Sequence, residues 1–273
     1  MAGRLLTPWL LVTPALAFLG VVFLYPVVTL LFSSLRVDGA LSFGNYAAFF
    51  SDGFNLQVLG RTLRVALVVT LISALVCYPA AYGMQSVPPR YRGLVTALII
   101  VPLMTSPVAR TYAWLVLLGQ TGIVNSTLVG SGLVQEPVRI LYTEWAVYIG
   151  LAQLFIPLML LTLISAMENL PRDVVPAARS LGATSLQSFT RVILPLTREG
   201  LVVGGTLVFT GCITAYVTPA LLGGARVQLL ATLLYQKAGV TVDYAAASVI
   251  SVIMLALTLT VAGALRGRTG RGR

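Results

Sequence analysis

The sequence has few charged residues. Only 10% of its 273 residues are Asp, Glu, Lys or Arg, whereas 58% are hydrophobic. A soluble domain needs about a quarter charged residues to cover its surface. This composition excludes a soluble globular protein and indicates a chain whose solvent is the lipid bilayer.

Histidine is absent, and there are only two cysteines. Cys77 and Cys212 both fall inside apolar runs, so we expect free, buried thiols rather than a disulfide. No cluster of Cys, Asp and Glu has a spacing typical of metal ligands. We therefore expect no metal site and no cofactor in this chain.

Strand-like alternation over about ten residues is also absent, whereas long apolar runs are frequent. In a bilayer only helices and closed barrels satisfy every backbone polar group. The sequence therefore predicts an all-α polytopic membrane protein with a single transmembrane domain over 1–273. Its six helices are expected at 9–31, 62–85, 94–118, 145–166, 201–222 and 244–265. Residues 119–134 could add a short interfacial or re-entrant segment, and the first helix is interpreted as a retained signal anchor.

The net charge of +10 is unevenly distributed between the two sides that six spans define. One side has 11 basic and 3 acidic residues, and the other has 7 basic and 5 acidic residues. Basic residues in short loops mark the cytoplasm. We therefore expect both termini, loop 86–93 and loop 167–199 in the cytoplasm, and we attribute the basic charge to membrane sidedness rather than to nucleic-acid binding.

The longest polar interruption in the second half of the chain is loop 167–199. Asp173 is a suitable N-cap, and Gly182 is suited to the left-handed turn that ends a helix. Thr184 and Gln187 have the spacing of a capping box, which starts a second helix expected to end before Pro195. The loop is thus predicted to be a helix-turn-helix. It either lies on the inner membrane surface or docks into another protein, and the small residues Ala177 and Ala178 favour docking.

Residues 176–195, P-A-A-R-S-L-G-A-T-S-L-Q-S-F-T-R-V-I-L-P, resemble the cytoplasmic EAA loop of permease subunits of binding-protein-dependent ABC importers. Pro176 stands where the family usually has glutamate. Four further strings resemble the first-permease branch of the spermidine/putrescine importers: Y-P-A-A-Y (78–82), S-P-V-A-R-T-Y-A-W (106–114), G-I-V-N-S-T-L (122–128) and Y-V-T-P-A-L-L-G-G (216–224).

This resemblance implies a MetI-like type I importer fold in a bacterial inner membrane and half of a pathway for a small solute, most simply a polyamine. Its implied partners are an ATPase dimer that binds ATP and Mg²⁺, a second homologous permease, identical or not, and a periplasmic solute-binding protein. The 171–195 loop would dock on the ATPase. The implied coupling residues are Asp173, Ala177, Ala178, Arg179, Leu181, Gly182 and Ala183.

The chain itself has no recognisable energy source and is expected not to be an enzyme. Its only lysine, Lys237, lies outside any Walker A pattern, and no span has a central acid of the kind that proton-driven carriers keep. Three alternatives stay open. They are an importer of another solute (a small amine, an aminophosphonate or ferric ion), a stand-alone carrier or channel, and a scaffold whose loop only recruits a partner.

The candidate pathway residues lie near the predicted outer ends of the helices. Arg110 either faces the bundle interior, in a structural or gating role, or extends to the interface. The aromatic residues either form an interfacial belt or meet a cation through their ring faces. The two acids either attract a cationic solute or are merely solvated. The candidates are Arg110, Tyr112, Trp114, Glu144, Tyr148, Tyr216 and Asp243.

Overall fold

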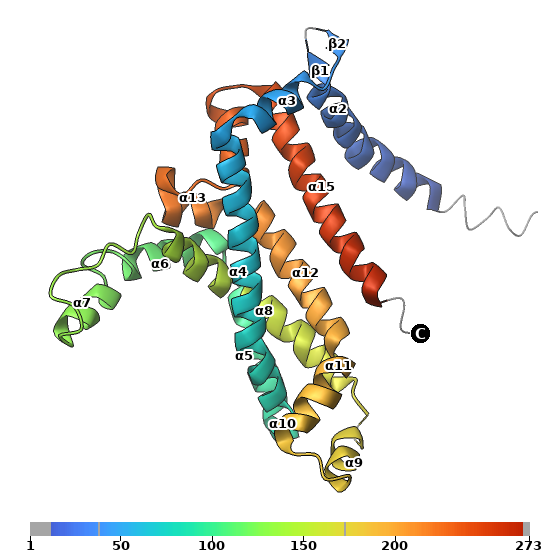
Figure 1. Cartoon of the computed structure of the whole chain (residues 1–273), viewed down its shortest axis with the longest axis vertical. Helices are drawn as coiled ribbons and strands as arrows, with labels where there is room; N and C mark the ends of the chain where they lie inside the picture. The colour runs from blue at the N-terminus through green and yellow to red at the C-terminus, as the bar shows by residue number, and fades with distance from the viewer. Residues whose placement is uncertain (1–11, 38, 172, 270–273) are drawn as a thin grey trace, which may run out of the picture. The chain divides into compact units, whose positions relative to one another are not determined.

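The computed structural model describes residues 12–37, 39–171 and 173–269, and these are largely helical (Figure 1). They divide into two compact units, which we describe separately. Unit 1 comprises Met1–Gln57 and Leu234–Ala256, and unit 2 comprises Val58–Leu233 and Leu257–Arg273. The expected start of the first helix at residue 9 lies outside the described residues. The prediction of one transmembrane domain stays a prediction.

Unit 1 begins with an apolar helix over Val12–Ser34 that includes the π-helical segment η1 (Gly20–Leu24) and α2 (Tyr25–Ser34). A hairpin of β1 (Arg36–Val37) and β2 (Ala40–Leu41) follows, and then α3 (Gly44–Ser51). The Asn45 side-chain amide donates to the carbonyls of Ser34 and Arg36, which ties α3 to the end of α2. The second part of the unit contains the π-helical segment η4 (Gln236–Val240) and the first half of α15 (Tyr244–Thr269).

Unit 2 holds the remaining helices. In chain order they are α4 (Gly53–Met84, beginning in unit 1), α5 (Pro89–Met104), α6 (Pro107–Leu117), α7 (Ile123–Gly130), α8 (Glu144–Glu168), α9 (Val174–Ser180), α10 (Ser185–Ser188), η2 (Phe189–Ile193), α11 (Leu194–Leu196), α12 (Arg198–Thr214), α13 (Val217–Gly223), η3 (Gly224–Arg226) and α14 (Leu230–Tyr235, ending in unit 1). Residues 119–134, where the sequence allows a short extra segment, contain α7.

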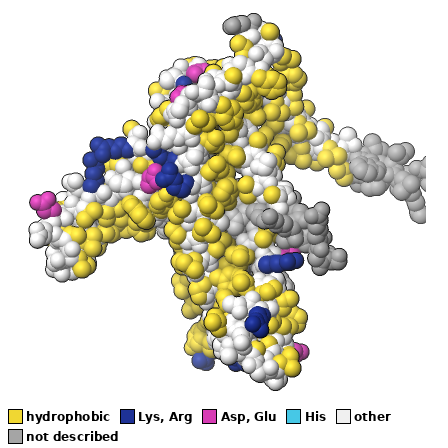
Figure 2. All heavy atoms as spheres, viewed as in Figure 1, with side chains coloured by type: hydrophobic (Ala, Val, Ile, Leu, Met, Phe, Trp, Pro, Cys, Tyr) yellow, Lys and Arg dark blue, Asp and Glu magenta, His cyan; other side chains and the backbone are white. Residues whose placement is uncertain are grey.

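Within the described residues, four helices are long and apolar enough to cross a bilayer, and up to seven spans result if each sharply bent helix pair counts as one. The four are Val12–Ser34, Gly53–Met84, Glu144–Glu168 and Tyr244–Ala264. The predicted six spans fall inside this range. Figure 2 shows that hydrophobic side chains cover most of the visible surface of the long helices, as expected for side chains that face lipid or another apolar subunit.

The helix expected over 94–118 is instead two helices, α5 and α6, which meet at 90°. Thr105 and Ser106 between them have extended ψ angles of 147° and 127°. A proline disfavours the α conformation in the residue before it, and Pro107 is the first residue of α6. The chain therefore turns sharply at a point where hydropathy alone shows one continuous apolar run.

The helix expected over 201–222 is also divided. α12 ends at Thr214, Ala215 is extended with ψ 122°, and α13 begins at Val217. Tyr216 lies at this junction and is half-buried. The chain therefore has a break at residues 215–216, inside the stretch expected to be one helix.

The core of unit 2 is built on the contact of α8 with α12. A Cβ atom at Gly204 would overlap Thr162 Oγ1 and Met159 Sδ, and one at Gly200 would overlap Ala166. Small residues let two helix backbones approach closely, which is how helices associate where the hydrophobic effect is weak. Cys77 and Cys212 are buried free thiols, as expected.

Candidate coupling loop and pathway residues

The loop between α8 and α12 folds as a helix-turn-helix at one end of unit 2 (Figure 1). At the end of α9, Ala183 N–H donates to Ala178 O at 3.0 Å and Gly182 N–H donates to Arg179 O at 2.9 Å. This pair of bonds is a Schellman motif, in which the residue after the cap takes a left-handed conformation. Gly182 has φ +83°, which a glycine adopts without strain. The predicted turn is confirmed.

The predicted capping box at the start of α10 is also confirmed. Gln187 N–H donates to Thr184 Oγ1 at 3.2 Å, and Thr184 N–H donates to Gln187 Oε1 at 2.9 Å. These two bonds satisfy N–H groups that a helix start leaves without partners. The turn is therefore fixed on both sides, by the Schellman motif before Gly182 and by the capping box after it.

For this loop, one local prediction is confirmed in position only, and another is wrong. Asp173 occupies the N-cap position of α9, but its side chain makes no capping hydrogen bond. The second helix does not end before Pro195. It continues through the π-helical segment η2 into α11, and Leu194 is helical with φ −58° and ψ −47°. A π turn is wider than an α turn, so it provides room for the proline ring that an α-helix lacks.

The outer surface of the loop is apolar and exposed. Leu181 and Leu186 have exposed fractions of 89% and 71%. Ala177, Arg179 and Gly182 are exposed beside them, whereas Ala178 and Ala183 are half-buried. Two such leucines on a short, doubly capped turn are typical of a surface that another protein covers.

Glu144, at the first position of α8, lies among basic side chains. Its carboxylate accepts from Arg61 Nε at 3.1 Å and lies 3.7 Å from Arg64 Nη1. Tyr148 Oη donates to its second oxygen at 3.2 Å. The side chains of Arg61 and Glu144 are only 15% and 30% exposed. Glu144 is thus the anion of an ion-pair cluster, and no local sequence pattern connects it to Arg61 and Arg64.

Asp243 also has local partners. Its carboxylate lies 3.5 Å from Lys237 Nζ and accepts from Ala246 N–H at 3.0 Å. It therefore caps the start of α15. The sequence placed Lys237 and Asp243 six residues apart, but only the backbone between η4 and α15 brings their side chains together.

Arg110 is half-buried in the first part of α6. Its Nε and Nη1 atoms are buried and have no hydrogen-bond partner among the described residues. Its neighbour Thr111 is buried and shares a hydrogen bond with Thr218 of α13 at 3.0 Å. A charged group at this depth needs a partner or a cavity. These two nitrogen atoms are thus buried donors that the described part of the chain leaves without an acceptor.

The aromatic candidates are not gathered at one site. Tyr112 is exposed, whereas Trp114 packs against the cluster of Leu118, Ala146 and Leu222. Tyr148 is buried, and its ring meets that of Trp145 edge-on at 5.7 Å. Trp114 and Tyr148 therefore contribute to packing within unit 2, and Tyr112 is the one of the three whose ring is accessible.

The comparisons with known proteins agree with this architecture. Residues 66–268 match the family described as "Binding-protein-dependent transport system inner membrane component". The chain belongs to this family. It is a permease subunit of an ABC importer with the MetI-like fold, and the predicted all-α polytopic fold is confirmed.

Two relatives are similar to this chain in sequence, and one solved structure is similar to it in fold. It is 35% identical over 262 residues to the spermidine/putrescine transport system permease protein PotB of Haemophilus influenzae, which covers 92% of this chain and 91% of the relative. It is 36% identical over 175 residues to PotB of Escherichia coli, covering 64% of each chain. A chain in the crystal structure of a bacterial alginate ABC transporter, in complex with a periplasmic protein bound to alginate pentasaccharide, superimposes with a TM-score of 0.82. That match has 17% identity and covers 98% of this chain and 95% of the other.

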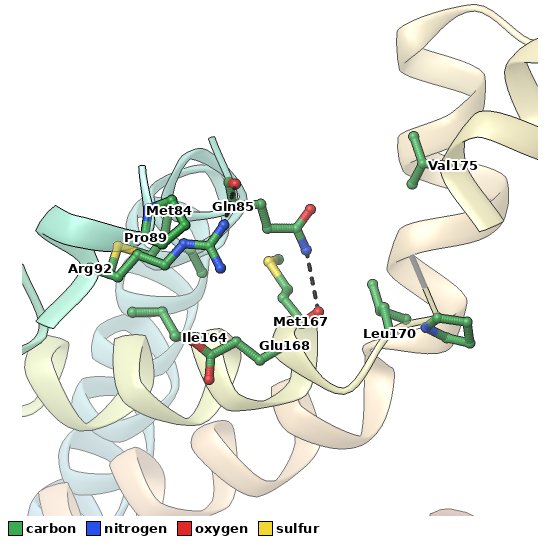
Figure 3. Close-up of a pocket in the computed structure, with 11 residues that line it drawn as sticks. Met84, Gln85, Pro89, Arg92, Ile164, Met167, Glu168, Leu170 and Val175 are labelled. Carbon is green, nitrogen blue, oxygen red and sulfur yellow. Dashed lines mark hydrogen bonds between the residues drawn. The ribbon is translucent and has the colours of Figure 1, made fainter. Parts of the chain in front are cut away.

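The permease has a cleft of about 650 Å³ next to its helix-turn-helix loop. Met84 and Gln85 at the end of α4 form one wall together with Met167 near the end of α8, and Val175 of α9 lies across the gap (Figure 3). Gln85 Nε2 donates to Met167 O at 3.4 Å, which joins the ends of α4 and α8. The cleft thus separates α9 from the helix ends that lie nearest to it.

Proposed function

We propose that this permease forms one half of the pathway of a polyamine importer and is driven by a separate ATPase that docks on residues 171–195. The solute rests on the 35% identity to a spermidine/putrescine permease over nearly the whole of both chains. The docking site rests on the doubly capped turn around Gly182 with its exposed leucines. The exposed turn is the observation that best supports the proposed docking of the ATPase.

The docking surface comprises the exposed side of α9 and the turn. Ala177 and Gly182 expose backbone that a partner can approach closely, and Leu181 supplies an apolar contact. Asp173, Ala178, Arg179 and Ala183 complete the surface. Since Pro176 has no carboxylate, we propose that docking depends on shape and apolar contact more than on charge. ATP and Mg²⁺ are bound by the ATPase dimer, and the permease contributes no catalytic residue.

On the outer side, a periplasmic solute-binding protein delivers the solute, and a second homologous permease supplies the other half of the pathway. Glu144 and Asp243 each have basic partners, so neither carboxylate is available to balance a polyamine. A cation in this half of the pathway would instead meet ring faces such as that of Tyr112, together with backbone carbonyls. Arg110 would repel it, which favours a structural or gating role for that residue.

The substitution Gly182→Trp tests the docking assignment. A bulky residue at φ +83° both strains the turn and projects into the partner's surface. We expect ATPase binding to fall by at least about tenfold, equivalent to about 1.4 kcal/mol, and uptake to be lost. The measurements are co-purification of the ATPase with the permease and uptake of radiolabelled spermidine into proteoliposomes that contain the whole transporter.

Gly182→Asn is the matched control, since asparagine tolerates a left-handed conformation better than other residues with side chains. It should retain most of both activities. Uptake that persists in Gly182→Trp would remove the docking assignment. Uptake without any ATPase would favour a stand-alone carrier. A binding protein that retains an aminophosphonate or ferric ion instead of a polyamine would change the solute but not the class of transporter.

A further inference from the structure

The ring of Phe189, the first residue of η2, lies between two tyrosines of α4. Its centroid is 5.2 Å from that of Tyr78 and 5.9 Å from that of Tyr82, with interplanar angles of 82° and 78°. Edge-to-face contacts of this kind are favourable and directional. Tyr78 and Tyr82 are four residues apart and so lie on one face of α4. The ring of Phe189 thus holds the loop segment η2 against α4 through its contacts with Tyr78 and Tyr82.

A buried hydrogen bond holds the other end of the same segment. Tyr78 Oη and Thr197 Oγ1 form a hydrogen bond, and both residues are buried. Thr197 lies between α11 and α12, and its hydroxyl also donates to Ile193 O at 2.8 Å. Tyr78 therefore contacts the segment 189–197 at both its first and its last residue, so this segment and α4 are expected to move together.

Among the described residues, the first helix of the loop, α9, makes no ring contact with α4 of the kind that Phe189 makes. α9 packs against α10 and η2, whereas the cleft separates Val175 from Met84 and Met167 (Figure 3). The backbone route from α9 to α8 runs through residues 169–171 and 173, which form no helix. We therefore expect a force applied to α9 to reach the long helices through α10 and η2, and Phe189 is the first side chain along that path that contacts α4.

We propose that Phe189, held between Tyr78 and Tyr82, is the positioning residue that transmits displacement of the coupling loop to α4. The proposal rests on the function proposed above. α4 then carries the displacement from Tyr78 to Thr62, which are about 24 Å apart at 1.5 Å per residue. At that far end Thr62 Oγ1 accepts from Leu230 N–H at 2.9 Å, and the adjacent Arg61 pairs with Glu144. Helix α4 therefore links the coupling loop to the ion-pair cluster of Arg61 and Glu144 at the opposite end of unit 2.

The substitution Phe189→Ala tests this linkage in the complete transporter reconstituted with its ATPase, second permease and binding protein. The quantity to compare is the number of spermidine molecules taken up per ATP hydrolysed. The docking surface is unchanged, so the ATPase should still bind and hydrolyse ATP. We expect the transport ratio to fall on the order of tenfold, within the range of coupling between sites. Tyr78→Phe, which keeps the ring and removes only the hydroxyl, should give a smaller fall.

Phe54→Ala is the matched control, because it removes an exposed phenylalanine ring from α4 and leaves the contacts of Phe189 with Tyr78 and Tyr82 intact. Its transport ratio should equal that of the wild type. Phe189→Leu keeps apolar volume and gives the same comparison if Phe189→Ala fails to assemble. The proposal would be overturned if both Phe189 variants took up as many spermidine molecules per ATP as the wild type. This includes the case in which uptake and ATP hydrolysis fall by the same factor. Absence of spermidine uptake by the wild-type transporter would instead overturn the proposed function.

Discussion

The role of Glu144 is interpreted differently once its neighbours in the structure are known. In the sequence it is one of few acids near a helix end and a plausible attractor for a cation. In the structure it accepts from Arg61 and Tyr148 and lies near Arg64. These partners come from α4 and α8, more than 80 positions apart in the case of Arg61. The carboxylate holds two helices together and is not free to bind solute.

The substitution Glu144→Gln separates these two roles. It leaves the largely buried guanidinium of Arg61 without its anion, so we expect the free energy of unfolding to fall by about 1–2 kcal/mol. Thermal unfolding of the purified permease in detergent should show a Tm lower by a few degrees. Glu136→Gln is the control, since Glu136 is exposed and forms none of the ion pairs found among the described residues. An unchanged Tm together with a raised KM for a polyamine would instead indicate a solute-binding acid.

At the scale of elements, the caps and the turn of the coupling loop were predictable, and the helix breaks were only partly so. Gly182, Thr184 and Gln187 act through the backbone within a few residues, so local spacing is sufficient to identify them. Pro107 restricts the backbone of Ser106 before it, but this local effect does not predict that α5 and α6 meet at 90°. Pro195 predicts the end of a helix, yet the chain accommodates this proline with a π turn at η2. Proline restricts the backbone locally, whereas packing decides the direction that the chain takes next.

The contact of α8 with α12 provides a prediction at this scale, from two adjacent glycines. A methyl group at Gly204 overlaps Thr162 and Met159, whereas one at Gly205 makes only an ordinary contact with Thr70 at 3.6 Å. We expect Gly204→Ala to lower the free energy of unfolding by about 1–3 kcal/mol, because it forces the two helices apart. Gly205→Ala should be neutral or stabilising by up to about 1 kcal/mol, since alanine favours helix. Equal Tm values for the two variants would contradict close packing at Gly204.

At the scale of the whole molecule, the distribution of arginine predicts the orientation in the membrane. The side with 11 basic residues should be cytoplasmic and should include the coupling loop. A single cysteine placed at Arg179 should therefore react with a membrane-impermeant thiol reagent only in inverted vesicles, and one placed at Glu136 only in intact cells. Cys77 and Cys212 are buried and provide little background. Labelling of both positions from one side would contradict the six-span topology.

The sequence by itself determined the membrane environment, the helical class, the family and the helix-turn-helix form of the loop between α8 and α12. These properties follow from the composition, the length of the apolar runs and the helix caps, all of which can be recognised within a few to about twenty consecutive residues. Only the tertiary structure decided which side chains meet: Phe189 with Tyr78 and Tyr82, Glu144 with Arg61 and Arg64, and Gly204 with Thr162. These contacts join residues far apart in the chain. They depend on how whole helices pack, which no local pattern in an apolar sequence specifies.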